Sequence, residues 1–474
     1  MDSQYGRVQA QHHAQQHDPQ QPQAQQPHAN SRINPHVFPR ATKLPRTGAR
    51  PGRFSPGAFP VALGVLLAAT LGFPPLDTSE AGAATKRSTP TKTVKPALPV
   101  KVSGAPVVVG WISRNGAGTQ EALLAEQYIN VNGGVSGRPL KMVTCSTKGS
   151  AASSKSCANQ LIGKGVKVVL EGSPDAGWPG AAELFRAAKV VVIGRAPLDA
   201  GEYSDPNAIY LAAPAATVLA GTGVYVATVD RSRGVGVLVS SDPATKAGSA
   251  LALGPIRASG VTPIITTLTN GNVGGSVVSA AITAATEAGT AAGGTSAIIA
   301  LVAEDQCVPV MEAAKAQAFA GRLITTDVCA TPAILEAAGG AAEGWVFVSA
   351  QPTSEAQPQL ALFTDYAAAA TKFKIKRSAE PSAALNFASV VDAVSLLTKL
   401  EKSVLDASPG VVGATVKSYL SRAEATSTYA PIPYAYKRSK LFPSVAGFTV
   451  YASQWSGGRF TEAPGGSKLD GFLG

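Results

Sequence analysis

From residue 106 onward, short apolar runs alternate with alanine-rich stretches of helical length. Four apolar runs come first, at 106–112, 140–145, 166–172 and 189–194, and all but the second are rich in valine. The stretches between them are predicted helices, at 118–131, 153–163 and 178–188. Near-continuous valine runs separated by helices are typical of parallel strands that are covered on both faces. This part of the chain is therefore predicted to be a doubly wound α/β unit.

The same alternation starts again near residue 234 and predicts a second unit. Its strands are predicted at 234–242, 261–268, 295–305, 322–327 and 343–350. Its helices are predicted at 243–258, 273–290, 308–320 and 332–338. Two blocks of this kind indicate two separate sheets. A long predicted helix at 384–402 and a strand pair around 446–462 come too late in the chain to belong simply to one unit.

A glycine-rich turn joins the first predicted helix to the second predicted strand. Asn132, Gly133 and Gly134 tolerate the positive φ angles at which helices end. Gly137 follows, and the alternating run at 140–143 then returns as a strand. The turn is expected at the edge of the sheet opposite the carboxyl ends of its strands, so its predicted role is structural.

The N-terminal region differs in composition from the rest of the chain. Residues 1–58 are expected to be disordered, because residues 1–36 are rich in Gln, His and Pro, have almost no aliphatic side chains to bury, and are followed by a basic stretch. All five histidines lie in this region, at His12, His13, His17, His28 and His36. A histidine-rich tract can bind metal, but the irregular spacing favours low-complexity sequence.

A basic stretch, a short apolar run and a group of small residues follow in order, at 40–53, 59–73 and 81–84. This order is typical of a secretory signal, which is assigned to residues 59–84. The apolar run is shorter than the about 20 residues that a membrane span needs. An uncleaved signal anchor is the alternative. Residues 85–105 mix Thr, Lys and Pro and are expected to form an extended linker.

Cleavage of this signal predicts a mature N-terminus near Ala84 or Thr85. N-terminal sequencing of protein from the cell envelope measures it directly. Recovery of only the intact, membrane-embedded chain would favour the anchored alternative. No methionine lies between Met1 and Met142, so a shorter product from a non-methionine start codon, for example at Val37, is also open.

The basic residues are scattered, although the formal net charge of the chain is +11 at pH 7. The one cluster, at 372–377, is too isolated to mark a nucleic-acid groove, so no nucleic-acid partner is predicted. A solvated surface is the better interpretation. A basic protein also suits an anionic cell envelope.

Four cysteines lie in the exported part of the chain, where the compartment permits disulfides. Sequence neighbours form the natural pairs, Cys145 with Cys157 and Cys307 with Cys329, among three possible connectivities. Zinc binding is the rival interpretation. It fails on spacing, because there is no Cys-x-x-Cys pair and no nearby histidine, and no metal site is predicted.

Catalytic motifs are not recognisable in the body of the chain. Since no histidine follows His36, the body has no Ser-His-Asp triad, Cys-His pair or imidazole metal site. Hydrolysis by paired acids, drawn from 304, 305 and 327, stays formally open. The glycines at 110–118 do not fit the dinucleotide-binding spacing. The prediction is a protein that is not an enzyme and has no cofactor.

Five segments, in this order, resemble the periplasmic-binding-protein type I family, specifically the branched-chain-amino-acid-type (Leu/Ile/Val-binding-protein-like) substrate-binding proteins of ABC transporters. The segments are 125–142, 145–157, 339–350, 385–397 and 447–455. The resemblance covers about residues 106–463. It implies an α/β protein of two doubly wound lobes joined by three crossovers, with a ligand held in the cleft and hinge closure around it.

The boundaries of the two lobes are then expected as follows. Lobe 1 comprises 106–216 and 352–425, and lobe 2 comprises 217–351 and 426–474. The three crossovers are expected near 213–220, 348–354 and 425–445.

Ligands of open α/β sheets bind at the carboxyl ends of the strands, which selects the candidate site. In lobe 1 the candidate residues are Ser113, Arg114, Asn115, Ser173, Asp175, Trp178, Arg195 and Ala196. In lobe 2 they are Asp242, Asp305, Gln306 and Asp327. The family commonly holds a ligand carboxylate with hydroxyls and helix N-terminal amides of lobe 1, and an ammonium with an acid of lobe 2. Ser173 and Asp327 match these roles.

The chain departs from the family pattern in lobe 1. The sequences "SPDAGW" (173–178) and "GRAP" (194–197) replace the usual hydroxyl residues, so another small polar compound is an alternative to an amino acid. Trp178 either stacks on the ligand or caps a helix. Arg195 pairs either with an anionic ligand or with Asp175.

Two further alternatives concern lobe 2. Asp242 precedes a proline, so a helix N-cap is the safer interpretation of this residue. Glu304 and Asp305 are adjacent, so in a strand at most one of them enters the cleft.

The predicted function is an extracytoplasmic, secreted or envelope-located solute-binding protein that delivers a small polar ligand to the membrane permease of an ABC importer. We expect it to be a monomer. The alternative is a ligand-sensing ectodomain that signals to a membrane partner, which an uncleaved anchor at 59–73 would favour.

Overall fold

The computed structural model describes residues 101–173, 177–197, 200–269, 273–378, 382–422, 425–426, 428–429, 432–466 and 468–471. The predicted disordered segment, the predicted signal and residues 85–100 of the predicted linker lie outside this range. Within it, no helix is long and apolar enough to span a membrane.

The first sheet has five strands in the order β2-β1-β3-β4-β5. They are β1 (Val107–Arg114), β2 (Leu140–Thr147), β3 (Val168–Glu171), β4 (Val191–Gly194) and β5 (Ala208–Tyr210). All four pairings are parallel. The sheet confirms the doubly wound unit expected from the valine runs.

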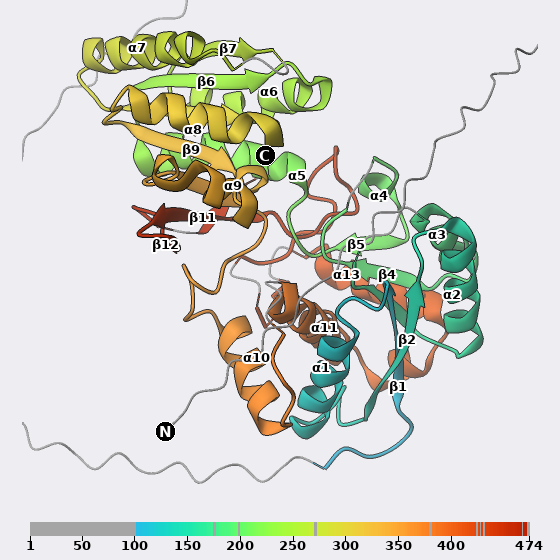
Figure 1. The fold of residues 1–474 in the computed structure, drawn as a ribbon. Coiled ribbons are helices and arrows are strands. Elements are labelled where there is room, and N and C mark those ends of the chain that lie inside the picture. The colour runs from blue at the N-terminus through green and yellow to red at the C-terminus, as the bar shows by residue number, and fades with distance from the viewer. Residues whose placement is uncertain are drawn as a thin grey trace, which may run out of the picture. The chain divides into compact units, whose positions relative to one another are not determined.

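Helices cover both faces of the first sheet (Figure 1). One face packs on α1 (Thr119–Val131), α10 (Ala361–Lys372), α11 (Ser382–Thr398), α12 (Lys402–Asp406) and α13 (Pro409–Leu420). The other packs on α2 (Ala151–Gly163) and α3 (Trp178–Ala187). A short helix, α4 (Ala200–Ser204), precedes β5. Side chains alternate along β1, so Trp111 enters the first core and Ile112 the second.

The second sheet has eight strands, in the order β12-β11-β10-β9-β8-β6-β7 with β13 paired to β11. They are β6 (Gly234–Ser240), β7 (Ile264–Leu268), β8 (Ser296–Leu301), β9 (Arg322–Thr326), β10 (Val346–Ser349), β11 (Thr449–Ser456), β12 (Arg459–Glu462) and β13 (Lys468–Asp470). The strands β6 to β10 pair in parallel, whereas β11 joins β10 antiparallel. The late strand pair is therefore an extension of this sheet.

The helices of the second sheet also form two layers. One layer contains α5 (Ala215–Val224), the π-helical turn Tyr225–Asp230 and α6 (Pro243–Ala258). The other contains α7 (Gly275–Ala291), α8 (Cys307–Ala316) and α9 (Pro332–Ala338). A Cβ atom on Gly223 would clash with the backbone of Ala252, so the close packing of α5 on α6 requires glycine there.

Several strands are shorter than predicted, for local reasons. β4 begins at Val191 rather than at 189, because Lys189 has a positive φ of 56°. β10 begins at Val346 because Gly344 has a φ of +83°. The strand predicted at 295–305 ends at Leu301, and a 3₁₀ turn, Glu304–Gln306, follows it.

The glycine-rich turn at 132–137 lies between α1 and β2, as predicted. The N–H of Gly134 donates to the carbonyl of Ile129 at 2.9 Å, and Val135 pairs with Arg138. Gly134 has a φ of +66°, and a Cβ atom there would clash with the carbonyl of Arg138. The turn leads into the amino end of β2, so it lies away from the carboxyl ends and is structural.

We call the first sheet with the helices packed on it the first lobe, and the second sheet with its helices the second lobe. The chain passes between the two lobes three times. The first passage is at 211–214, at the start of the predicted range 213–220, because Val218 and Val224 of α5 already belong to the core of the second lobe. The second joins β10 to α10, near the predicted 348–354.

The third passage is later than the predicted 425–445. Phe442, Val445 and Phe448 pack in a core of the first lobe, and the N–H of Tyr210 donates to the carbonyl of Ser444 at 2.9 Å. These apolar residues cover the free edge of β5. Residues 432–446 consequently pack with the first lobe, although the expected boundary placed them in the second.

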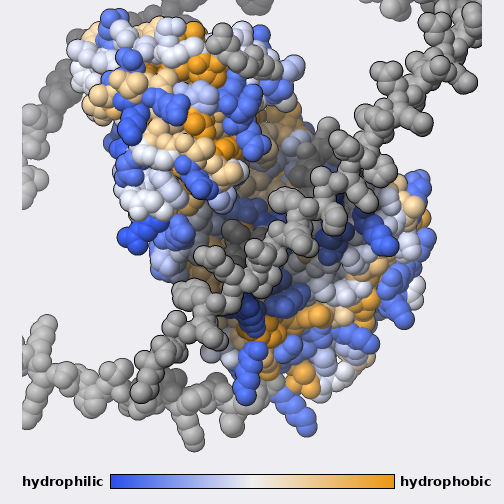
Figure 2. Space-filling view, viewed as in Figure 1, coloured by the Kyte–Doolittle hydropathy of each residue, from blue (hydrophilic) through white to orange (hydrophobic). Residues whose placement is uncertain are grey.

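The visible surface is mostly hydrophilic, with hydrophobic residues in scattered patches (Figure 2). The cluster of basic residues between α10 and α11 is exposed at Lys372, Lys374, Lys376 and Arg377. This distribution agrees with the solvated surface predicted from the scattered charges.

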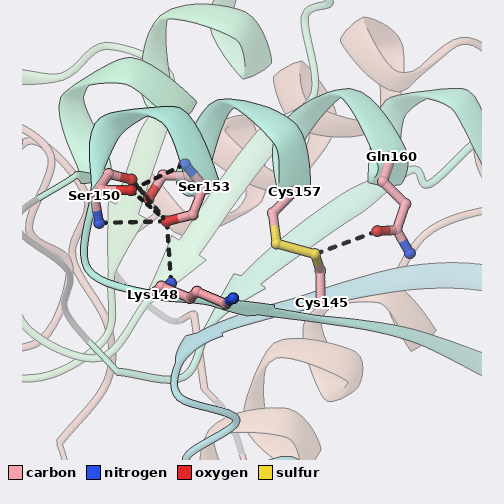
Figure 3. The surroundings of a disulfide bond; sticks show 7 residues. Cys145, Lys148, Ser150, Ser153, Cys157 and Gln160 are labelled. Atoms are coloured by element: carbon pink, nitrogen blue, oxygen red, sulfur yellow. Dashed lines mark hydrogen bonds between the residues drawn. A yellow bond between two sulfur atoms is a disulfide. The ribbon is translucent and has the colours of Figure 1, made fainter.

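Both predicted disulfides are present, and each lies within one lobe. Cys145 of β2 is bonded to Cys157 of α2, with a Cα–Cα distance of 5.6 Å. Figure 3 shows this bridge beside Gln160, with Ser150 capping the first turn of α2 together with Ser153. Cys307, the first residue of α8, is bonded to Cys329, with a Cα–Cα distance of 5.5 Å.

Candidate functional site

The carboxyl edge of the first sheet holds the first group of predicted site residues. Ser113 and Arg114 are the last two residues of β1, not loop residues as predicted. The N–H of Arg114 donates to Ser173 Oγ at 3.0 Å, and the N–H of Asn115 donates to the carbonyl of Thr147 at 2.9 Å. The structure therefore brings Arg114 and Ser173 together. Ser113 is only 1% exposed, so its hydroxyl is a core group.

Trp178 is not a ligand-facing residue. It is the first residue of α3, is 3% exposed and lies in a core of the first lobe. The centroid of its ring lies 6.1 Å from that of the Phe185 ring, about two helical turns further along α3. The apolar face of α3 packs on the sheet from its first turn, and Trp178 belongs to that face. Stacking on a ligand therefore has no support in this core position, whereas the alternative, that Trp178 caps the cleft-facing helix, agrees with its place as the first residue of α3.

Arg195 follows β4 and points into a small pocket of about 90 Å³. Its Nη1 donates to Asn386 Oδ1 of α11 at 3.2 Å. Burial lowers the pKa of the Arg195 guanidinium to about 10. Its expected partner Asp175 lies outside the described residues, so this ion pair stays a prediction. Ala196 lines neither this pocket nor the larger one described below.

Two of the four predicted residues of the second lobe have local structural roles, and a third is exposed to solvent. Asp242 is the N-cap of α6, where its Oδ2 accepts the N–H of Thr245 at 2.8 Å, which confirms the safer interpretation. Gln306 is 1% exposed, and its side chain bonds the backbone of Ala303 and Thr269. Asp305 lies exposed in the 3₁₀ turn Glu304–Gln306. The expectation of strand alternation at 304 and 305 is therefore wrong.

Among the predicted residues of the second lobe, Asp327 lines a large pocket. It follows β9 directly, and its Oδ2 accepts a hydrogen bond from Ser349 Oγ at 2.9 Å at the end of β10. The residue keeps contact with solvent. Even so, desolvation by the surrounding protein raises the pKa of its carboxyl, against the opposing effect of hydrogen bonds from Ser349 and from backbone N–H groups. The carboxylate is thus held in position by Ser349 at the rim of the pocket.

The large pocket has a volume of about 810 Å³ and is lined by both lobes. On the side of the second lobe, the end of β9, helix α9 and strands β10 to β12 contribute, for example through Asp327, Leu335 and Trp455. On the side of the first lobe, α10, the residues after it and the start of α11 contribute, for example through Tyr366, Arg377 and Leu385. The second passage of the chain forms its floor with Gln351 and Pro352.

The small pocket adjoins the large one and has a few charged side chains among mostly apolar lining. Both are lined by Gln351, Pro352 and Leu385. Besides Arg195, the small pocket contains Asp392, which accepts the N–H of Tyr429 at 2.9 Å and the hydroxyl of Tyr434 at 3.1 Å. The two pockets therefore meet at the second passage of the chain, where side chains of both lobes converge.

The large pocket combines mostly apolar lining with a few polar side chains. Within the described part of the chain, no group of three or more His, Cys, Asp or Glu side chains could hold a metal ion. Asp327 is one carboxylate that the structure fixes at the rim, and most of the lining surface is apolar. A pocket with largely apolar walls and a few oriented polar groups is typical of small-molecule sites.

Residues 107–427 match the family model described as "Periplasmic binding protein". This match spans more than half of the chain. The chain belongs to the periplasmic binding protein family. Proteins of this family are binding proteins rather than enzymes.

Solved structures share the fold of this periplasmic binding protein. One is a protein assigned to branched-chain amino acid ABC transport in Rhodospirillum rubrum, with 14% identity, a TM-score of 0.60, and coverage of 76% of this chain and 100% of that one. Another is an ABC transporter substrate-binding protein of Desulfitobacterium hafniense, with 16% identity, a TM-score of 0.52 and the same coverage. A further structure from that organism, a complex with Leu, has 16% identity, a TM-score of 0.51 and the same coverage. No curated protein matches the sequence.

The sequence missed much of the large pocket of this periplasmic binding protein. Tyr366, Arg377 and Leu385 come from the region of α10 and α11, and Trp455 and Phe460 come from the β11–β12 hairpin. The strand-end rule selects only loops that follow parallel strands, and none of these residues lies in one. One hint of this part of the pocket was present in the sequence: the predicted late helix and strand pair were elements without a place in either unit.

Proposed function

We propose that this protein captures a small ligand between its two lobes outside the cytoplasm and delivers it to the permease of an ABC importer. The observation that supports this most directly is the large pocket, which receives side chains from both lobes and has Asp327 at its rim. Membership of the periplasmic binding protein family agrees with it. We further propose that the protein acts as a monomer, and that residues 59–84 direct its export.

Closure of the lobes follows from the position of the pocket. A ligand that touches both walls gains contacts when they approach, so it binds the closed state more tightly than the open one and shifts the population toward it. The three passages of the chain at 211–214, 350–360 and 447–448 are the segments that can absorb such a hinge motion. A permease that recognises the closed form would then receive only loaded protein.

Replacement of Asp327 with Asn should weaken ligand binding by about 1.5–3 kcal/mol, the range of a hydrogen bond to a charged group. This corresponds to roughly a 10- to 140-fold rise in Kd. The ligand is the solute that native mass spectrometry identifies on the purified protein, and calorimetry measures its affinity. Stability should change little, because Asp327 is exposed.

Asp242→Asn is the matched control for this experiment. It makes the same chemical change at an acid that caps α6 and lines neither pocket, and Asn is as good an N-cap as Asp. Its affinity should equal that of the unmodified protein. Equal affinities of both variants and the unmodified protein would show that the ligand lies elsewhere.

A further inference from the structure

Three aromatic rings form one wall of the large pocket. Phe347 of β10, Trp455 of β11 and Phe460 of β12 all line it. The centroid of the Phe460 ring lies 5.0 Å from that of Trp455 and 5.7 Å from that of Phe347, with the rings edge to face in both pairs. Phe347 is buried, whereas Trp455 and Phe460 are half-buried, so these two rings keep surface toward the pocket. We call these three residues the aromatic wall.

The opposite side of the pocket is apolar as well. Phe363 and Tyr366 of α10 and Leu385 of α11 line it. Tyr366 is held by the core of the first lobe, where its ring lies 5.7 Å from that of Phe387. A bulky apolar group can therefore be covered from both lobes at once. Burial of such a group stabilises the complex because it removes apolar surface from water.

The charged residues that line the pocket are mostly acidic. Asp327, Glu336 and Glu355 carry negative charges and Arg377 carries a positive one, which gives 1 − 3 = −2. Glu355 is fixed beside the aromatic wall, because its Oε2 accepts the N–H of Phe460 at 2.9 Å. Asp327 is fixed by Ser349. Two oriented carboxylates thus flank the aromatic wall, and the pocket favours positive charge.

We propose that the large pocket binds an organic cation, an amine or quaternary ammonium ion, whose apolar or aromatic body lies against the aromatic wall. Ring faces attract cations, most strongly that of tryptophan, and the carboxylates add to this attraction. The volume of about 810 Å³ falls in the range of about 300–1,000 Å³ that holds drug-sized ligands. This assignment rests on the proposed function and names its ligand class.

A set of three probes with the same phenylpropyl body tests the assignment by calorimetry on the mature protein, freed of co-purified solute. The probes are 3-phenylpropylamine, 3-phenylpropan-1-ol and 3-phenylpropionate, which are cationic, neutral and anionic at pH 7. The amine should bind at least tenfold more tightly than the alcohol and the carboxylate. Tightest binding by the carboxylate, equal binding of amine and alcohol, or no binding of the amine would each overturn the proposal.

Two variants locate the bound probe. Asp327→Asn should reduce the difference between amine and alcohol severalfold, since it removes a charge and keeps the shape. Trp455→Ala should weaken the amine about tenfold, whereas Trp455→Phe, which keeps a ring and preserves folding, should weaken it less. The assignment to this pocket would be overturned if Asp327→Asn, Trp455→Phe and Trp455→Ala all bound the amine as tightly as the unmodified protein.

Failure of the ligand class and failure of the proposed function give different results. If the co-purified solute closes the lobes but the amine does not bind, the ligand class is wrong and the proposed function stands. If the amine binds as described but neither it nor the solute closes the lobes, the ligand class is supported and the proposed function is wrong. L-Leucine is the comparison ligand, and binding of leucine tighter than the amine would also overturn the ligand class.

Discussion

Replacement of Trp178 with alanine should lower the free energy of unfolding by about 3–5 kcal/mol, the range for removing a buried tryptophan or phenylalanine ring. The ring is 3% exposed and packs among the side chains of α2, α3 and the first sheet, so its loss leaves a cavity in that core. Ligand affinity should not change in the folded variant, because Trp178 lines neither pocket. Denaturant unfolding measures the first quantity and calorimetry the second.

Trp455→Ala is the natural counterpart, since the two tryptophans should have opposite effects. Trp455 is half-buried and lines the large pocket, so its removal should affect affinity more than stability. If Trp178→Ala unfolded like the unmodified protein but bound ligand weakly, Trp178 would be a ligand-binding residue, and its assignment to the core of the first lobe would be contradicted.

Removal of the Cys307–Cys329 disulfide by serine substitution should lower the free energy of unfolding by about 3 kcal/mol, the chain-entropy value for a loop of this length. The two cysteines are separated by 22 residues. The substitution should also weaken ligand binding severalfold. Cys329 ends the 3₁₀ turn that begins at Asp327, so the bridge ties the backbone of Asp327 to the start of α8.

The Cys145–Cys157 disulfide is the control for this second effect. Its residues are 12 apart, so the chain-entropy estimate is again about 3 kcal/mol. It joins β2 to α2 in the first lobe and touches neither pocket. Its removal should destabilise the protein to a similar extent without a change in affinity. Equal losses of affinity in both variants would mean that the effect comes from general destabilisation, not from the position of Asp327.

The architecture was predictable because parallel strands that are buried on both faces require long valine runs. β1, β3 and β4 follow such runs, and their helices have lengths and positions close to those predicted. Some strand ends were predicted wrongly because a single residue there has a positive φ, as Lys189 does. Nothing in the sequence distinguishes this lysine from the others. The late segments were recognised as elements, but their partners depend on tertiary packing that periodicity does not encode.

The candidate site was predictable only where strand-end geometry decides it. Asp327 and Arg195 follow parallel strands directly, and each lines a pocket. Asp242 follows the same rule but serves as a helix cap. The rule identifies an edge of the sheet and does not separate side chains that face a ligand from side chains that end a strand or begin a helix.

The aromatic wall shows why the rest of the site could not be read from the sequence. Phe347 is separated from Trp455 by more than 100 residues, and an antiparallel pairing of β10 with β11 brings them onto one face. Residues of α10 and α11 line the same pocket. These helices follow the second passage of the chain, from β10 to the first lobe. Each of these residues has the local sequence of an ordinary core position.

Small-angle X-ray scattering of the mature protein, without its co-purified solute and after that solute is added back, tests the central claim most directly. If the ligand binds between the lobes and favours their closed state, the radius of gyration should decrease on addition, and Asp327→Asn should require more ligand for the same decrease. An unchanged radius of gyration at a concentration where calorimetry shows full binding would contradict the account.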